Sequence, residues 1–196
     1  MKHAADRVSA ILLILALTPL LLVIAIAVRL SSPGPVLFAH ERIGTNGRPF
    51  RMWKFRSMRV GAADQLAELL SIYGRGDEPL FKIPDDPRIT RLGKWLRRWS
   101  LDELPQLWNV AIGQMSLVGP RPQIDAEVLL YTPDDHGRLQ VRPGITGLWQ
   151  VSGRSGLSWE EAIRLDLHYV NNWSLLLDVR ILVRTVSAVL NGRGAG

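Results

Sequence analysis

The chain has 196 residues, no cysteine and a formal net charge of +6. This length allows one domain with a buried core plus an appendage, and the missing cysteines exclude a disulfide framework and a thiolate metal site. Residues 1–60 carry nine Lys and Arg against two acids, whereas residues 61–196 carry fifteen against sixteen. The chain is therefore not a uniformly basic nucleic-acid-binding protein, and its basic zone favours an anionic membrane surface.

The most apolar segment covers residues 8–28, with Lys2 and Arg7 before it and Arg29 after it. Its 21 residues are enough to cross a bilayer, which requires about 20. A cleaved signal peptide is disfavoured because its apolar core usually has only about 7–15 residues. A simple spanning helix does not explain why both flanks are basic, since Lys and Arg should favour one side.

Pro19 lies in the middle of this apolar segment, where its ring and its missing N–H kink a helix. Each half would then be roughly 16 Å long, about half of a ~30 Å hydrocarbon core. A helix–break–helix hairpin that enters and leaves on one face fits both basic flanks. From these residues alone, a re-entrant hairpin and a kinked spanning helix are equally supported.

Two strands are predicted next, at residues 36–43 and 48–58, joined by a turn that contains Asn46-Gly47. The second strand carries cations among its aromatic residues, namely Arg51, Lys54 and Arg56. Two interpretations are open: a solvated strand face, or contact with lipid head groups or a substrate phosphate.

Further helices are predicted at residues 62–73, 88–99, 158–170 and 174–190. Residues 88–99 place apolar side chains at helical spacing among five cations, which is typical of an interfacial helix. Ser158 with Glu161 reads as an S-x-x-E capping box at the start of its helix.

A pair of acids, Asp102 and Glu103, follows a run of cations. Ser100 with Glu103 also reads as a capping box, which predicts that both acids lie in the first turn of a helix, close to Pro105. Backbone N–H groups there favour phosphates and help to gather a divalent cation. The alternative is that the acids only neutralise a helix terminus.

Several arginines stand beside turn-forming residues. Arg121 lies between Pro120 and Pro122, which lock the backbone, and a guanidinium held in this way suits bidentate phosphate recognition. Arg142 and Arg154 repeat the pattern less strictly.

With these motifs in order, the chain resembles the monotopic phosphoglycosyl transferases of bacterial glycoconjugate assembly, from about residue 5 to about residue 190. The blocks that carry the resemblance are Thr18-Pro19, KFRSM at residues 54–58, SLDELPQLWNV at 100–110, MSLVGPRP at 115–122 and VRPGITG at 141–147. One departure is Gln114, where many relatives have Asp.

The resemblance implies an α+β, predominantly α fold. A re-entrant membrane helix over residues 1–30, broken at Thr18-Pro19, would anchor a catalytic domain over residues 31–196, with a short β-hairpin and interfacial helices. The active site would face the cytoplasm at the bacterial inner membrane. Members move a sugar-1-phosphate from a UDP-sugar to polyprenyl phosphate, give UMP and require Mg²⁺. A homodimer is compatible with the sequence.

The resemblance also implies roles for single residues. Asp102 matches the nucleophile and would hold Mg²⁺, and Glu103 matches the second acid of the pair. Arg97 and Arg121 match phosphate-binding positions, whereas Arg142 and Arg154 are weaker candidates.

Two adjacent carboxylates normally raise each other's pKa, but the helix terminus, the cations and Mg²⁺ should oppose that effect and keep Asp102 ionised. The competing hypothesis is a non-catalytic, membrane-anchored module that binds anionic lipids; a DNA-binding domain has little support.

Overall fold

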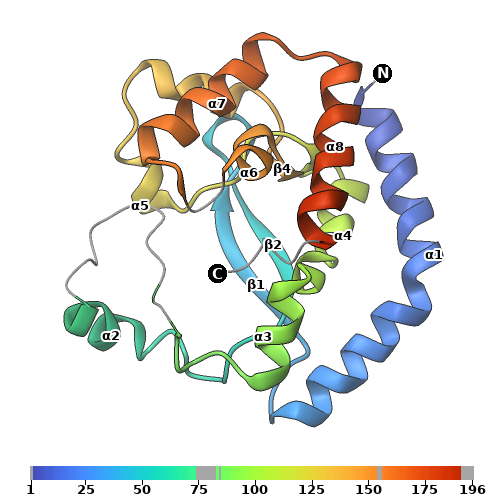
Figure 1. Cartoon of the computed structure of the whole chain (residues 1–196), viewed down its shortest axis with the longest axis vertical. Helices are drawn as coiled ribbons and strands as arrows, with labels where there is room; N and C mark the ends of the chain where they lie inside the picture. Colours follow the sequence, from blue (N-terminus) through green and yellow to red (C-terminus); the bar gives the residue numbers. More distant parts are fainter. Residues whose placement is uncertain (1, 74–82, 84, 154–155, 191–196) are drawn as a thin grey trace.

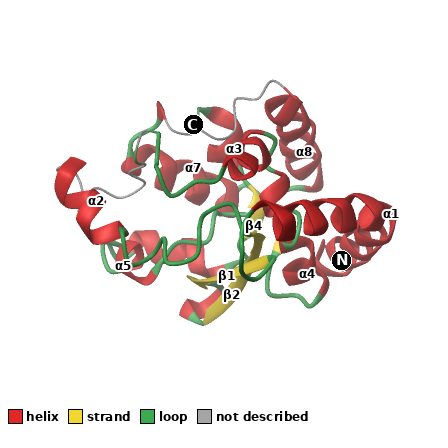
Figure 2. Cartoon of the chain, turned by 90° about the horizontal axis from the view of Figure 1, so that it is seen from below, coloured by secondary structure: helices red, strands yellow, loops and turns green. Residues whose placement is uncertain are grey.

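The fold is mainly helical around two small sheets, as shown by a computed structural model that describes residues 2–73, 83, 85–153 and 156–190 (Figure 1). This confirms the predicted α+β, predominantly α class. Seen from below, the helices lie around the strands (Figure 2). The elements after the hairpin are α2 (Leu66–Tyr73), α3 (Arg91–Arg98), η2 (Leu101–Glu103), α4 (Gln106–Ala111), β3 (Ser116–Val118), α5 (Asp125–Val128), η3 (Asp134–Gln140), β4 (Gly144–Thr146), α6 (Leu148–Ser152), α7 (Trp159–Asn171) and α8 (Leu175–Leu190).

The first helix, α1 (Lys2–Ser31), runs through Pro19 without interruption, although its course bends along one side of the molecule (Figure 1). The predicted break of the helix is therefore not seen. Proline removes only its own donor from the helical ladder, and a helix accommodates that loss by bending. The Thr18 hydroxyl donates to the Ile14 carbonyl at 2.8 Å, a back-bond that also favours a bend.

Both halves of α1 pack against the same body. Ala10, in the first half, is fully buried against Leu107 of α4, whereas Val28, in the second half, is fully buried against Phe55 and Leu96. Apolar burial of this kind stabilises by about 25 cal/mol for each Å² removed from water. The two ends of α1 are thus held by one domain.

The C-terminal end of α1 is capped by Arg56, a side chain that is only 8 % exposed. Its guanidinium donates to the carbonyls of Ser32 at 2.7 Å and Pro33 at 2.6 Å, and to that of Val28 at 3.3 Å. Carbonyls at a helix end have no partner within the helix, and a cation complements the dipole there. Neither open interpretation of the strand cations therefore applies to Arg56.

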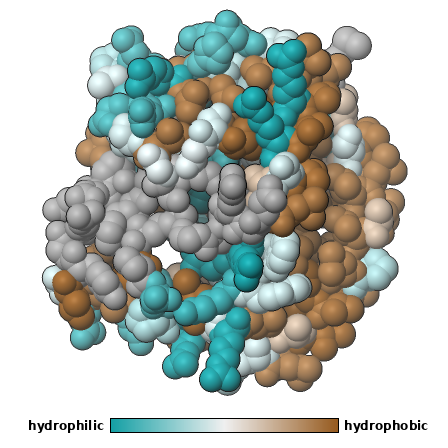
Figure 3. Space-filling view, viewed as in Figure 1, coloured by the Kyte–Doolittle hydropathy of each residue, from teal (hydrophilic) through white to brown (hydrophobic). Residues whose placement is uncertain are grey.

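The outward side of α1 stays apolar and uncovered. It is the one described helix long and apolar enough to cross a membrane, and only 11 % of its most apolar window is buried. Helix α8 adds exposed apolar side chains of its own, among them Leu176, Val179 and Val183. The space-filling view shows hydrophobic residues gathered along the side where α1 lies (Figure 3).

The predicted hairpin is confirmed as β1 (Leu37–Ile43) and β2 (Pro49–Phe55), which pair antiparallel. The turn includes Asn46 in the left-handed region at φ 57°. Phe50 and Met52 of β2 are buried in the core with residues of α1 and α4. The second sheet is a short parallel pair of β3 and β4.

The predicted capping box at the start of α7 is confirmed. The Ser158 hydroxyl accepts from the Glu161 N–H at 3.2 Å, and the Glu161 carboxylate accepts from the Ser158 N–H at 2.9 Å. Each bond satisfies a backbone donor that the first helical turn leaves free.

Candidate functional site

The acid pair lies in η2, a single 3₁₀ turn between α3 and α4. Ser100 adopts the left-handed conformation at φ 52°, and its side chain makes no capping bond. The predicted capping box at Ser100 is therefore wrong. Helix α3 ends at Arg98, the chain turns at Ser100, and α4 begins only after Pro105. Neither acid lies in the first turn of an α-helix.

Asp102 is buried, with 6 % of its surface exposed. Burial raises its pKa, and the neighbouring Glu103 raises it further. Lys54 and Arg97 lower the same pKa, as does a backbone hydrogen bond, but the sum is a raised value. Desolvation of the carboxylate therefore outweighs the cations in setting the direction of this shift, and the expectation that Asp102 is ionised when Mg²⁺ is bound stays a prediction.

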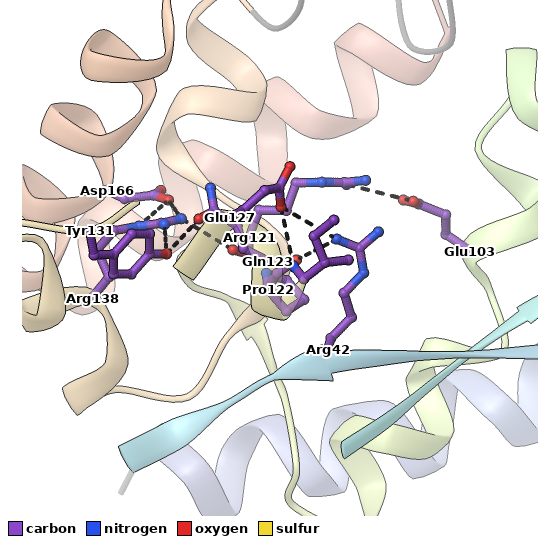
Figure 4. A network of polar contacts seen from close by, with 10 residues as sticks. Arg42, Glu103, Arg121, Pro122, Gln123, Glu127, Tyr131, Arg138 and Asp166 are labelled. Carbon is purple, nitrogen blue, oxygen red and sulfur yellow. Dashed lines mark hydrogen bonds and ion pairs between the residues drawn. The ribbon is translucent and has the colours of Figure 1, made fainter. Parts of the chain in front are cut away.

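Glu103 joins two cations from separate parts of the chain. Its Oε1 lies 2.6 Å from Lys54 Nζ and 3.8 Å from Arg121 Nη1. Figure 4 shows Arg121 extending toward Glu103 across the space between their segments. The structure thus brings Arg121, which the resemblance assigns to phosphate binding, to the second acid of the pair. Lys54, for which a solvated role was equally open, belongs to this site.

The strand face beside Lys54 adds two residues that sequence reasoning missed, His40 and Arg42. Burial lowers the pKa of His40 to about 4, and Arg42, Lys54 and Arg121 lower it as well. Burial, followed by the charge of Arg121, lowers the pKa of Arg42 to about 10. His40 is therefore neutral at pH 7, in a site where the cations crowd one another. His40 and Arg42 are two residues apart in β1, so their side chains lie on the same face of the strand. This spacing shows that they approach Lys54 only when the register that pairs Phe38 with Lys54 is known.

The backbone of Arg121 is held by a buried ion pair. Arg138 Nη2 donates to the Arg121 carbonyl at 3.2 Å, and Arg138 is itself bound to Asp166, with Nε 3.1 Å from Oδ2. The Arg138 and Asp166 side chains are 2 % and 0 % exposed. Burial raises the pKa of Asp166 to about 6, against the opposing effects of Arg138 and Arg121. Such a pair costs desolvation energy, so it is better suited to fixing geometry than to adding stability.

The rest of the loop after Arg121 is fixed from two further directions. Arg138 also donates to the Tyr131 hydroxyl, which in turn donates to Gln123 Oε1 at 2.6 Å (Figure 4). Arg42 Nη1 donates to the Pro122 carbonyl at 3.4 Å. These bonds restrain the backbone from which the Arg121 side chain extends toward Glu103.

The other predicted arginines do not all lie near the acid pair. Arg97, at the end of α3, is close enough to lower the pKa of Asp102. Arg142 lies instead at the N-terminal end of α1, where it lines a surface hollow with Arg7. The structure thus does not bring Arg142 to the acid pair, because the segment before β4 directs it toward α1. Arg154 lies outside the described residues.

The carboxylates of the site can be compared with the ligands that the predicted Mg²⁺ requires. Within the described ranges, no three His, Asp or Glu side chains gather as a preformed metal site. Glu103 is engaged by Lys54 and Arg121, so Asp102 is the carboxylate left to act as a ligand. Mg²⁺ commonly takes one or two carboxylates, with water and substrate phosphates completing its shell. The residues present fit that open arrangement and do not fit a closed all-protein site.

Comparison with known proteins gives consistent results. A family model described as bacterial sugar transferase matches residues 1–192. The chain is 46% identical over 199 residues to the UDP-galactose-lipid carrier transferase of Erwinia amylovora, covering 100% of this chain and 41% of that protein. It is 41% identical over 198 residues to the undecaprenyl-phosphate galactose phosphotransferase of Salmonella typhimurium, with the same coverage of 100% and 41%.

A third relative is close to this chain in length. The exopolysaccharide production protein ExoY of Sinorhizobium fredii is 43% identical over 197 residues, covering 99% of this chain and 87% of that protein. By contrast, the chain spans about two fifths of the Erwinia and Salmonella proteins.

Proposed function

Because the chain belongs to the bacterial sugar transferase family, we propose that it transfers a sugar-1-phosphate from a UDP-sugar to polyprenyl phosphate. The products would be a polyprenyl diphosphate sugar and UMP. The observation that carries this proposal is the buried Asp102 beside Glu103, with Lys54, Arg97 and Arg121 directed at the pair. A reaction between anionic partners needs such a group of fixed cations around a carboxylate.

In the first step, an ionised Asp102 oxygen attacks the β-phosphorus of the UDP-sugar. The bond from this phosphorus to the bridging oxygen breaks, UMP leaves with that oxygen, and an aspartyl phosphosugar remains. In the second step, an oxygen of polyprenyl phosphate attacks the same phosphorus and releases the Asp102 carboxylate. Two steps allow a water-soluble donor and a lipid acceptor to use the site in turn.

The cations would offset the negative charge at different points. Arg121, aimed across the site, suits the diphosphate, because a guanidinium fork binds phosphate oxygens in pairs. Lys54 and Arg97 keep a share of Asp102 ionised. Bound through Asp102, Mg²⁺ would supply further positive charge to the diphosphate and the leaving group.

Glu103 would orient the neighbouring cations rather than deprotonate the acceptor phosphate. A phosphate monoester has a second pKa near about 6, so the acceptor is largely ionised without a base. The Glu103 carboxylate instead fixes Lys54 at 2.6 Å and draws Arg121 to within 3.8 Å.

We further propose that α1 is re-entrant, with the active site on the cytoplasmic side of the inner membrane. The packing of both halves of α1 on one domain supports this, since a spanning helix would carry one half away. The cysteine-free chain permits a direct test with single cysteines at Ala5 and at Ser31, which are both exposed. A re-entrant helix predicts that an impermeant maleimide labels both from the same side of sealed vesicles, whereas labelling from opposite sides would establish a spanning helix.

The activity is tested by screening UDP-sugars for UMP release with polyprenyl phosphate in vesicles. Release that requires both substrates supports the transferase. An inert protein that still binds anionic vesicles would favour the alternative of a lipid-binding module. Which UDP-sugar gives the signal would identify the donor.

A further inference from the structure

A second group of cations lies at the N-terminal end of α1, beside α8 (Figure 1). The carboxylates of this region already have partners. Asp6 accepts from the Ser116 hydroxyl and lies 3.5 Å from Lys2 Nζ, and the same Nζ donates to Asp178 at 2.5 Å. These bonds fasten the start of α1 to β3 and α8.

Arg7 and Arg142 have no such partner. Among the described residues, neither guanidinium lies within 4 Å of a carboxylate or donates a hydrogen bond. Both line one surface hollow of about 320 Å³, together with His3, Ala4 and Val8. Burial and the nearby charge of Arg7 lower the pKa of Arg142. The Asp6 carboxylate opposes this effect, but it is already engaged by Ser116 and Lys2. Two guanidinium groups that line one hollow without an ion pair form a site suited to an anion.

The backbone positions of the two arginines are well fixed. Arg7 lies over Gly113, where a Cβ would stand only 2.0 Å from its Nη2, so the absence of a side chain there leaves room for the guanidinium. Arg142 precedes Pro143, whose carbonyl accepts from the Ser116 N–H at 2.8 Å. Its side chain therefore starts from a backbone that is tied to β3.

The wall of the hollow leads directly onto apolar surface. Val8 belongs to the hollow and is 57 % exposed, and the next exposed large apolar side chains along α1 are Ile11, Leu12, Leu13 and Leu15. A ligand that contacts both the two arginines and the apolar side chains of α1 carries a phosphate next to a hydrocarbon chain. A nucleic acid or a free nucleotide would leave the apolar part uncovered.

We propose that Arg7 and Arg142 bind the phosphate headgroup of an anionic phospholipid, with its acyl chain along α1. This site is separate from the acid pair, and its lipid is a bound structural ligand rather than a substrate. Because it is assayed by binding, it can be tested whether or not the proposed transfer reaction is correct.

The test uses the full chain in detergent micelles, with phosphatidylglycerol and phosphatidylcholine as probes and native mass spectrometry as readout. We expect one phosphatidylglycerol to be retained per chain in preference to phosphatidylcholine. Each cation near a membrane surface contributes about fivefold in affinity, so the double variant R7Q/R142Q should bind about 25-fold more weakly. The matched control R48Q/R59Q removes two exposed arginines in and just after the hairpin and should change retention less than about twofold.

A second variant and a melting temperature separate a loss of binding from a loss of folding. R7K/R142K keeps both charges but loses the guanidinium forks, so its affinity should fall less than that of the glutamine variant. Because no ion pair is broken, the melting temperature of R7Q/R142Q should equal or exceed that of the wild type.

Three results would overturn the proposal: equal retention of phosphatidylcholine, an equal loss in the hairpin control, or displacement of the lipid by millimolar inorganic phosphate. The last would assign the hollow to a free phosphate instead.

Discussion

The two groups of cations differ in whether the cations that face the site form ion pairs with a carboxylate. Lys54 and Arg121 converge on Glu103, so their positions are set before any substrate arrives. Arg7 and Arg142 line a hollow and form no ion pair, and the nearby Asp6 carboxylate is already engaged by Ser116 and Lys2. A cation paired in advance is preorganised for charge that develops during a reaction, whereas an unpaired one is suited to a permanent anion. The predictions below test this difference.

The largest effect is expected for Asp102→Asn. Without the nucleophile, turnover should fall by about 10⁴-fold or more, while vesicle binding stays at the wild-type level because α1 is untouched. UMP release measures the turnover, and vesicle sedimentation measures the binding to vesicles. Asp64→Asn, at an exposed position, is the matched control. Normal product formation by the Asp102 variant would remove this residue from the mechanism.

Lys54→Met should lower kcat/KM by about 10²-fold, since it removes a preorganised positive charge and the partner of Glu103 at 2.6 Å. Lys94→Met removes an equal charge from an exposed ion pair with Asp85 at 3.3 Å and should have little effect. Steady-state kinetics on both variants checks this. Similar losses in the two would mean that Lys54 acts only through the overall charge.

The Arg138–Asp166 pair should affect substrate binding through Arg121. We expect Asp166→Asn to raise KM for the UDP-sugar by about tenfold with a smaller change in kcat, because the loop that carries Arg121 loosens. Breaking a buried pair also destabilises, by about 3–5 kcal/mol. Asp178→Asn breaks a buried ion pair away from the acid site, with Lys2 at 2.5 Å, and is the control for stability alone. A KM that rises equally in both would assign the effect to general loss of structure.

The pH dependence follows from the raised pKa of Asp102. Only the ionised carboxylate attacks, so activity should fall as the pH drops through that raised pKa, at a higher pH than an ordinary aspartate would give. Lys54 lowers this pKa, so Lys54→Met should move the acid limb of kcat/KM to still higher pH. An acid limb that stays in place would show that another group controls it.

The smallest effect is expected for Arg142→Gln in neutral-lipid vesicles. The side chain lines the hollow at α1 rather than the acid site, so kcat/KM should change by less than about twofold. A loss as large as that of Lys54→Met would bring Arg142 back into the active site.

One sequence pattern shows how far local reasoning extends. S-x-x-E occurs at Ser158 and at Ser100, and only the first forms a capping box. Ser158 has φ −67° and ψ 165°, the extended geometry of a helix start, whereas Ser100 has φ 52° and ends a turn after α3. The difference comes from the preceding helix and from Pro105, which together leave one short 3₁₀ turn between them.

The site itself could be predicted where motifs carry local constraints and not where contacts are tertiary. Asp102, Glu103 and Arg121 stand in distinctive motifs, Arg97 follows from the family resemblance, and the structure places both arginines near the acid pair. His40 and Arg42 were missed because their approach to the site depends on strand register. Arg142 was placed with the acids because its Arg-Pro context resembles that of Arg121, and only packing separates the two.

The covalent step is tested most directly by intact-protein mass spectrometry after incubation with a UDP-sugar and no lipid acceptor. The account predicts a mass increase of one phosphosugar, located on the peptide that contains Asp102, and its loss when polyprenyl phosphate is added. A competent enzyme that shows no adduct, or that carries it on another residue, would contradict the two-step mechanism.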